Sequence, residues 1–150
     1  MLTVGSAVPD FVLTNQHEEV VDLATHRGQR VLIFFYPKAS TPGCTQQACG
    51  LRDIASSVAG TVIVGISPDK PAAQKKFDDK YALGYELLAD TEHTVAEAFG
   101  VWQEKVNYAK RYMGIVRSAF LIDPKGVVEQ AWYKISPSDT PTKLLEAVGK

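Results

Sequence analysis

The stretch "RVLIFFYP", residues 30–37, constrains the fold of this chain more than any other part of the sequence. Its continuous apolar run contains β-branched and aromatic residues and is stopped by Pro37, a pattern typical of a strand buried on both faces. A second run, "TVIVGIS" at residues 61–67, predicts another buried strand. Strands buried on both faces need helices on both sides of the sheet, so the two runs predict a layered α/β fold.

The remaining segments fit this layered plan. We expect a hairpin near the start, within residues 10–23, and a short strand over residues 85–90. Two further strands are expected at residues 117–123 and 127–135, joined by a tight turn at "PKG". Helices are predicted within residues 43–57, 70–82, 91–100 and 140–149. Together they predict a three-layer α/β domain with a mixed sheet, occupying residues 1–150 as a single unit.

Two local details of this plan can be checked directly. In "TEHTVAEAFG", Thr91 is expected to be the N-cap of a short helix that ends at Gly100. The apolar and aromatic side chains of Trp102, Tyr108, Tyr112 and Met113 are expected to pack around a loop, and the alternative is that some of them wall the active site.

Composition excludes several classes of function. The chain has 16 basic and 17 acidic residues, a net charge of −1 and no clustered basic run, which argues against nucleic acid or an anionic membrane as a main partner. No 18 consecutive residues are apolar, and the first residues lack a basic region followed by an apolar stretch, so a cytoplasmic location is expected. The histidines lie in separate segments without ligand spacing, which predicts no metal. These are His17, His26 and His93.

The chain has only two cysteines, Cys44 and Cys49, and both lie on one predicted helix. Two cysteines do not form the disulfide framework of a small secreted domain, so a chemical or packing role is expected for reduced thiols. Cys44 falls in the first turn, after Thr41 as a plausible cap and Pro42 as a first-turn residue, where backbone N–H groups favour a thiolate. Gly43 allows the backbone to approach a small ligand closely.

The helix terminus alone is too weak to activate the thiol. Shifting a thiol from its usual pKa of about 8.5 to about 6 takes roughly 3.4 kcal/mol, whereas a helix terminus supplies about 0.3–1 kcal/mol and at most about 2. A cation must therefore contribute. Arg117 in "GIVRSAF" is the best candidate, because it precedes a late strand that we expect beside the first central strand. The Thr41 hydroxyl is also expected near the sulfur.

The spacing of the two cysteines carries a mechanical consequence. On an ideal helix, residues five apart have Cα atoms separated by about 8–9 Å, whereas a disulfide needs them within about 7 Å. If the two thiols bond, the first turns of the helix must unwind. Gly43 and Gly50 make such local melting less costly. We therefore expect oxidation to be coupled to a conformational change.

The stretch "FYPKASTPGCTQQACGLRD" resembles the peroxiredoxins, because Pro37, Thr41 and Cys44 match their Pro-x-x-x-Thr-x-x-Cys motif. The five-residue spacing to Cys49, with "GISPDK", "FGVW" and "GIVRSAFLIDPKG", is similar to the peroxiredoxin Q or bacterioferritin comigratory protein subfamily in particular. The similarity runs from "VGSAVPDFVL" to the last helix. It implies a thioredoxin-like fold and a thiol-dependent peroxidase that needs no cofactor.

The resemblance also implies roles for individual residues. Cys44 would be the peroxidatic cysteine and Cys49 the resolving one. Pro37, Thr41, Gly43 and Arg117 would form the substrate site, with Thr41 and Arg117 binding and polarising the peroxide and Pro37 shielding it. The substrate would be hydrogen peroxide or an organic hydroperoxide, and a thioredoxin-type protein would reduce the resulting disulfide. A monomer is expected, because the resolving thiol lies on the same chain.

Three other functions remain open at the level of the sequence. A dithiol-disulfide oxidoreductase would share the fold, but its thiols are normally two residues apart. A redox-sensing or binding module without turnover is also compatible with these residues. A cysteine hydrolase is disfavoured, since no histidine lies near Cys44 in the chain.

Overall fold

The structure is a computed structural model that describes residues 2–58 and 60–148. The strands are β1 (Val12–Asn15), β2 (Val20–Asp22), β3 (Arg30–Phe35), β4 (Thr61–Ser67), β5 (Glu86–Ala89), β6 (Trp102–Asn107), β7 (Lys110–Ile115), β8 (Ser118–Ile122) and β9 (Val128–Trp132). The α-helices are α1 (Pro42–Ile54), α2 (Pro71–Tyr81), α3 (Thr94–Ala98) and α4 (Asp139–Val148), and short 3₁₀ helices follow β2 and α1 as η1 (Leu23–His26) and η2 (Ala55–Val58).

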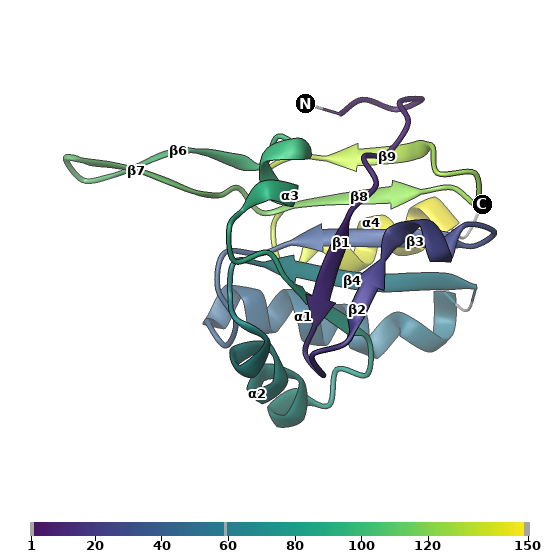
Figure 1. Ribbon diagram of the computed structural model, residues 1–150, viewed down its shortest axis with the longest axis horizontal. Helices are drawn as coiled ribbons and strands as arrows, with labels where there is room; N and C mark the ends of the chain where they lie inside the picture. Colours follow the sequence, from purple (N-terminus) through teal and green to yellow (C-terminus); the bar gives the residue numbers. More distant parts are fainter. Residues whose placement is uncertain (1, 59, 149–150) are drawn as a thin grey trace.

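The central sheet is mixed, as the sequence predicts. Its strand order is β2-β1-β5-β4-β3-β8-β9. β3, β4 and β5 run parallel, whereas β8 pairs antiparallel with β3, β9 with β8 and β1 with β5 (Figure 1). The parallel strands are linked by α1 and α2, as βαβ connections require.

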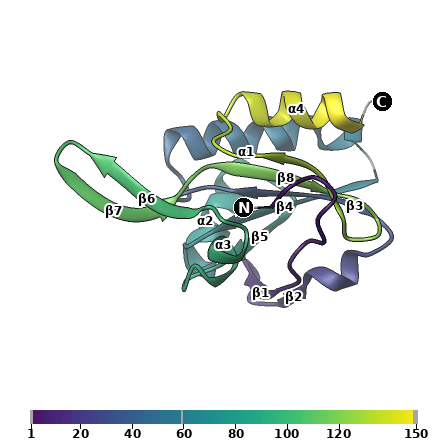
Figure 2. The same cartoon turned by 90° about the horizontal axis from the view of Figure 1, so that it is seen from above.

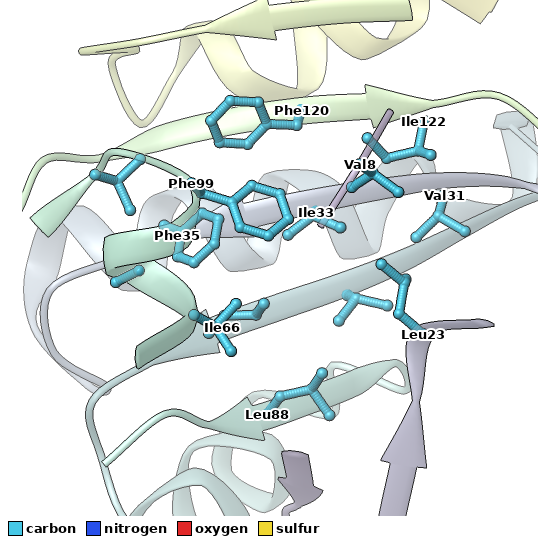
Figure 3. Packing of buried hydrophobic residues seen from close by; sticks show 14 of the residues in the cluster. Val8, Leu23, Val31, Ile33, Phe35, Ile66, Leu88, Phe99, Phe120 and Ile122 are labelled. Atoms are coloured by element: carbon cyan, nitrogen blue, oxygen red, sulfur yellow. The ribbon is translucent and has the colours of Figure 1, made fainter. Parts of the chain in front are cut away.

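β3 explains why helices cover both faces of the sheet. Its side chains alternate between two separate hydrophobic clusters. Leu32 and Phe34 pack with residues of α1, α2 and α4, and Ile33 and Phe35 pack with residues of α3 and the amino-terminal segment. Figure 3 shows the second cluster, in which Phe35, Phe99 and Phe120 lie together. In Figure 2, α1 and α4 lie on one side of the sheet and α3 lies on the other.

Most predicted elements are confirmed, with boundaries shifted by a few residues. The start of α3 is different from the prediction. Thr91 is not its N-cap, because the helix begins at Thr94 and His93 holds the cap position with a left-handed backbone. The buried carboxylate of Asp90 accepts hydrogen bonds from the N–H groups of Val95 and Ala96 instead. The side chain of Asp90 therefore caps the amino terminus of α3, the role that the sequence predicted for Thr91.

Residues 102–115 form an element that the sequence did not predict. β6 and β7 pair as an antiparallel hairpin, forming a second sheet that projects from the body of the molecule (Figures 1 and 2). The expectation that Tyr108, Tyr112 and Met113 pack around a loop is wrong, since their side chains are exposed, Tyr108 at 97%. Trp102 does pack, stacked on His93 with ring centroids 3.9 Å apart.

The hairpin and the start of α1 lie at the same end of the sheet (Figures 1 and 2). β3 ends there, and residues 36–41 lead from it into α1. This is the carboxyl edge of the parallel strands, the usual position of binding sites in open α/β sheets. Across the part of the chain that the structure describes, no helix combines the length and the hydropathy needed to cross a membrane.

Candidate active site

Cys44 lies in the first turn of α1, directly beyond the carboxyl end of β3. Its side chain is 1% exposed and belongs to the cluster that includes Tyr36, Ala39 and Ala48. Pro42 starts the helix and has no N–H, so the amides of Gly43 and Cys44 are the first-turn donors without a partner four residues back. The thiol is thus held in a dry position at the positive end of a helix dipole.

Arg117 contacts Cys44, as the sequence suggested. β8 pairs antiparallel with β3, and Ser118 is opposite Phe35. Arg117 therefore lies beside the residues that leave β3 for α1. Its Nη1 atom lies 3.4 Å from the sulfur of Cys44, within the range of a hydrogen bond to sulfur. The guanidinium thus places a positive charge next to this sulfur.

Gln47 joins this arrangement and was not identified from the sequence. Its Oε1 atom accepts a hydrogen bond of 2.8 Å from Nη1 of Arg117, and its Nε2 donates one of 2.9 Å to the hydroxyl of Thr140 in α4. Gln47 and Thr140 are both buried. The glutamine thus holds the guanidinium against Cys44 and ties it to α4. Gln47 is three residues after Cys44, so helical spacing would have placed both on one face.

The other predicted site residues lie in the first turn of α1 and in the loop before it. Thr41 is the N-cap residue of α1, but its hydroxyl donates to the carbonyl of Lys38 at 2.8 Å and does not cap the helix. Gly43 faces Arg117: a Cβ built there would lie 3.2 Å from Nη2, so a side chain at this position would press on the guanidinium. Pro37 is half-buried at the start of the connecting loop.

A buried polar network fixes the loop of residues 36–41. The carboxylate of Asp69 accepts hydrogen bonds of 2.7 Å from the N–H of Ala39 and the hydroxyl of Ser67. Gln74 donates to Ser67 and accepts a hydrogen bond from the hydroxyl of Tyr36. Burial raises the pKa of Tyr36 far above its usual value. Its hydrogen bonds with Ser67 and Gln74 lower this pKa, and the charges of Asp69 and Cys44 raise it further. Tyr36 is therefore a neutral donor that anchors the loop.

Cys49 lies one and a half turns further along α1. It is half-buried, with Tyr81 and Tyr85 packed against the same cluster. The helix is continuous from Pro42 to Ile54 and both thiols are free. On a continuous helix, two residues five apart have Cα atoms about 8–9 Å apart, too far for a disulfide.

The structure offers Cys44 no metal site. Among residues 2–58 and 60–148, no group of three or more histidine, cysteine, aspartate or glutamate side chains could hold a metal ion. A pocket of about 370 Å³ lies elsewhere, beside the ion pair of His26 and Glu86, and Cys44 is not part of its lining.

Comparisons with known proteins identify the family of this chain. The chain matches the AhpC/TSA family over residues 4–131. It is 49% identical over 133 residues to peroxiredoxin Bcp of Escherichia coli (strain K12), with 87% of this chain and 85% of that protein covered. It is 42% identical over 149 residues to peroxiredoxin Bcp of Bacillus subtilis (strain 168), with 98% and 95% covered.

A solved structure of the bacterioferritin comigratory protein of Xanthomonas campestris superposes with a TM-score of 0.89 at 32% identity, covering 99% of this chain and 96% of that one. The predicted thioredoxin-like architecture is thereby confirmed. The chain belongs to the AhpC/TSA family and is, within it, a peroxiredoxin of the bacterioferritin comigratory protein subfamily.

Proposed function

We propose that this peroxiredoxin reduces hydroperoxides through a two-thiol cycle within one chain, with Cys44 as the peroxidatic and Cys49 as the resolving cysteine. The observation that carries the proposal is the 3.4 Å contact between Nη1 of Arg117 and the sulfur of Cys44 at the start of α1. A buried thiol at a helix terminus, with an arginine bound to it, has the features of an activated nucleophile.

In the first step the Cys44 thiolate attacks the terminal oxygen of a hydroperoxide. The S–O bond forms as the O–O bond breaks, Cys44 becomes a sulfenic acid, and the departing alkoxide or hydroxide takes a proton to leave as an alcohol or water. Arg117 and the free amides of the first turn stabilise the charge that develops along the O–O bond. Thr41 and Gly43 line the approach to the sulfur, and Pro37 shields it.

In the second step Cys49 attacks the sulfenic sulfur, which yields an intramolecular disulfide and water. The first turns of α1 must unwind for the two sulfurs to meet, because the helix holds them too far apart. Unwinding breaks the contacts of Arg117 with Cys44 and Gln47. A disulfide formed in this way protects Cys44 from oxidation to sulfinic acid.

The substrates and partners follow from this chemistry. The X. campestris relative is known for alkyl peroxide reduction activity, and we infer that this chain accepts organic hydroperoxides as well as hydrogen peroxide. A thioredoxin-type dithiol protein returns the disulfide to two thiols. Because both cysteines lie on one chain, turnover is complete in a monomer of one thioredoxin-like domain, and a reducing compartment such as the cytoplasm suits two free thiols.

The stoichiometry of thiol loss tests the cycle. Reduced wild type and Cys49→Ser are each treated with one equivalent of hydrogen peroxide, and free thiols and intact mass are read. We expect the wild type to lose both thiols and two hydrogens, and the variant to trap one oxygen on Cys44.

Sustained peroxide consumption with a thioredoxin-type reductant then separates a catalytic cycle from a redox sensor or binding module that reacts once. Wild type that keeps both thiols in excess peroxide would contradict the proposal and return both cysteines to a packing role.

A further inference from the structure

A proline from the carboxyl-terminal part of the chain lies beside the guanidinium of Arg117. A Cβ built on Gly43 would lie 3.2 Å from Nη2 of Arg117 and 3.5 Å from Cγ of Pro137. The two side chains therefore border one small space, which is left open because residue 43 has no side chain. Gly43 directly precedes Cys44, and Nη1 of the same guanidinium lies 3.4 Å from the sulfur of Cys44. The space is thus part of the surroundings of this thiol.

The two sides of this space differ in polarity. Nη1 of Arg117 donates to Cys44 and Gln47, whereas Nη2 has no hydrogen-bond partner within the two described ranges of the chain. Across the space, Pro137 presents only the carbon atoms of its ring. Arg117, Gly43 and Pro137 are all half-buried, so each keeps part of its surface in contact with solvent. A free N–H donor and an apolar ring therefore face a molecule that enters here.

The backbone on both sides of Pro137 is held in place. The N–H of Ile135 donates to the carbonyl of Arg117 at 3.0 Å. After the proline, the hydroxyl of Thr140 donates to the carbonyl of Ser136, also at 3.0 Å. The ring itself fixes φ at residue 137. The apolar wall is therefore ordered before a substrate arrives, which lowers the entropy cost of binding against it.

We propose that Pro137 is a specificity-determining residue of the peroxide site, whose ring contacts the carbon substituent of an organic hydroperoxide. The inference rests on the proposed function and deepens it, because it names the residue that recognises this class of substrate. An organic hydroperoxide has a polar O–O–H end and an apolar carbon end. The space beside Gly43 offers each end a matching partner, Nη2 of Arg117 for the oxygen and the ring of Pro137 for the carbon.

The direction of the reaction agrees with this placement. The thiolate attacks the terminal oxygen, so the oxygen that carries the substituent is the one further from the sulfur. Nη1 of Arg117 is next to the sulfur and Nη2 is next to the space beside Gly43. Nη2 is thus free to donate to the departing oxygen, where negative charge develops, and the substituent on that oxygen extends onto Pro137.

Hydrogen peroxide makes no use of this wall, because it has no carbon substituent. Pro137 should therefore change the preference between substrates and leave the reactivity of Cys44 itself unchanged. One methylene group in an apolar pocket typically changes kcat/KM by about 10- to 200-fold. Because Pro137 is only half-buried, we expect an effect at or below the lower end of that range.

The test compares cumene hydroperoxide with hydrogen peroxide on four proteins that share a Cys49→Ser background. These are Cys49→Ser alone and its combinations with Pro137→Asn, Pro137→Leu and Pro141→Ala. The second-order rate of Cys44 oxidation is measured as the loss of the single remaining thiol, so that neither the resolving cysteine nor a reductant takes part. The result is the ratio of the two rates in each protein.

Pro137→Asn should lower the rate with cumene hydroperoxide about three- to tenfold and keep the rate with hydrogen peroxide within about twofold. Pro137→Leu also removes the ring but keeps an apolar side chain, so its ratio should stay within about twofold of that of Cys49→Ser alone. Pro141→Ala is the matched control. It removes a proline ring that packs on Gly50 of α1, six residues beyond Cys44, and it should leave the ratio unchanged.

The variants separate recognition of the substrate from a role in shaping the backbone. If Pro137 only shaped the backbone, Pro137→Leu and Pro137→Asn would lower both rates equally, and that result would overturn the inference. Equal ratios in all four proteins would also overturn it, while the peroxidatic role of Cys44 would stand. A Cys44 that reacts with neither hydroperoxide would overturn the proposed function and this inference with it.

Discussion

At the scale of single residues, the site depends on an arginine that two partners hold in place. Nη1 of Arg117 donates to both Cys44 and Gln47, so the guanidinium is positioned before any substrate arrives. In the proposed mechanism, charge that develops as the O–O bond breaks meets a cation whose orientation is already fixed. Preorganised groups of this kind are usually the largest single contribution to catalysis.

Replacing the arginine with a neutral residue should therefore reduce peroxidase activity strongly. We expect Arg117→Gln to lower kcat/KM for hydrogen peroxide by at least about 100-fold, the usual loss for one preorganised donor. The measurement is steady-state turnover with a recycling reductant. Arg111→Gln removes an equal charge from an exposed position on the hairpin and should retain nearly full activity. A loss below about threefold in Arg117→Gln would show that the contact is incidental.

Gln47 should affect stability and activity together. Gln47→Leu leaves the buried hydroxyl of Thr140 without its donor and releases Arg117. We expect a decrease in the free energy of unfolding of about 1–3 kcal/mol, measured by urea denaturation, and lower activity at the same time.

Thr140→Val is the matched control for Gln47→Leu. It removes the α4 partner, but it leaves the contact of Gln47 with Arg117 in place. The control should lose stability and keep most of its activity. Equal activity losses in both variants would argue against a positioning role of Gln47.

The sequence indicated some of these residues and not others, for physical reasons. Cys44 and Arg117 could be predicted, because one follows a buried strand at a helix start and the other precedes a strand that pairs with it. Thr140 could not, since its contact arises from the packing of α4 on α1, which local sequence does not specify.

At the scale of elements, α1 combines two glycines with different neighbours. Gly43 faces the guanidinium of Arg117, and Gly50 faces the ring of Pro141 in α4. In an exposed helix, replacing glycine with alanine usually stabilises by about 1 kcal/mol, since glycine has the higher conformational entropy when unfolded. Here an added methyl group would come close to a neighbouring side chain at either position. One substitution should affect the activity and the other the stability.

We expect Gly50→Ala to lower stability and Gly43→Ala to lower activity. A Cβ at residue 50 would lie 2.9 Å from Cγ of Pro141, so α1 and α4 must shift, at a cost of about 1–3 kcal/mol. At residue 43 the methyl group would lie 3.2 Å from Nη2 of Arg117 and displace the guanidinium. Urea midpoints and kcat/KM on both variants check the contrast, and a Gly50→Ala more stable than wild type would contradict this packing.

The pattern of apolar residues predicts some strands of this protein and misses others. β3 and β4 were predicted because their runs are buried on both faces. The β6–β7 hairpin was not, because its residues are a mixture of polar, charged and apolar types, and its apolar side chains Val106 and Met113 are exposed. Its turn is also atypical, since Tyr108 adopts a positive φ of 59° where hairpins usually have asparagine or glycine.

At the scale of the whole molecule, the face of the sheet covered by α1, α2 and α4 contains one buried tyrosine and half-buried tyrosines as well as aliphatic residues. Tyr36 is fully buried and donates to Gln74, and Tyr85 donates to the carbonyl of Ala48 at 2.8 Å. Burial raises the pKa of both phenols well above the usual value near 10. Both phenols therefore stay neutral in the folded protein.

The free energy of unfolding should consequently decrease at alkaline pH, and the ionisation of Tyr36 in the unfolded chain should account for part of this decrease. Below about pH 10 the phenol is neutral in both folded and unfolded chains, so it adds no pH dependence. Above that pH the unfolded chain loses the proton and the folded chain keeps it, so each such tyrosine lowers the free energy of unfolding by about 1.4 kcal/mol per pH unit.

Tyr36→Phe separates the two contributions of this residue. At pH 8 it should be less stable than wild type by about 1–2 kcal/mol, because Gln74 loses its donor. Above pH 10 the folded wild type keeps Tyr36 protonated while its unfolded chain loses the proton, which lowers the free energy of unfolding of the wild type alone. The difference in this free energy between wild type and Tyr36→Phe should therefore decrease and reach zero near about pH 11. Urea denaturation at pH 8, 10 and 11 measures this difference, with Tyr108→Phe as an exposed control that should follow the wild type throughout. A difference that stays constant with pH would mean that Tyr36 ionises as readily in the folded chain as in the unfolded one.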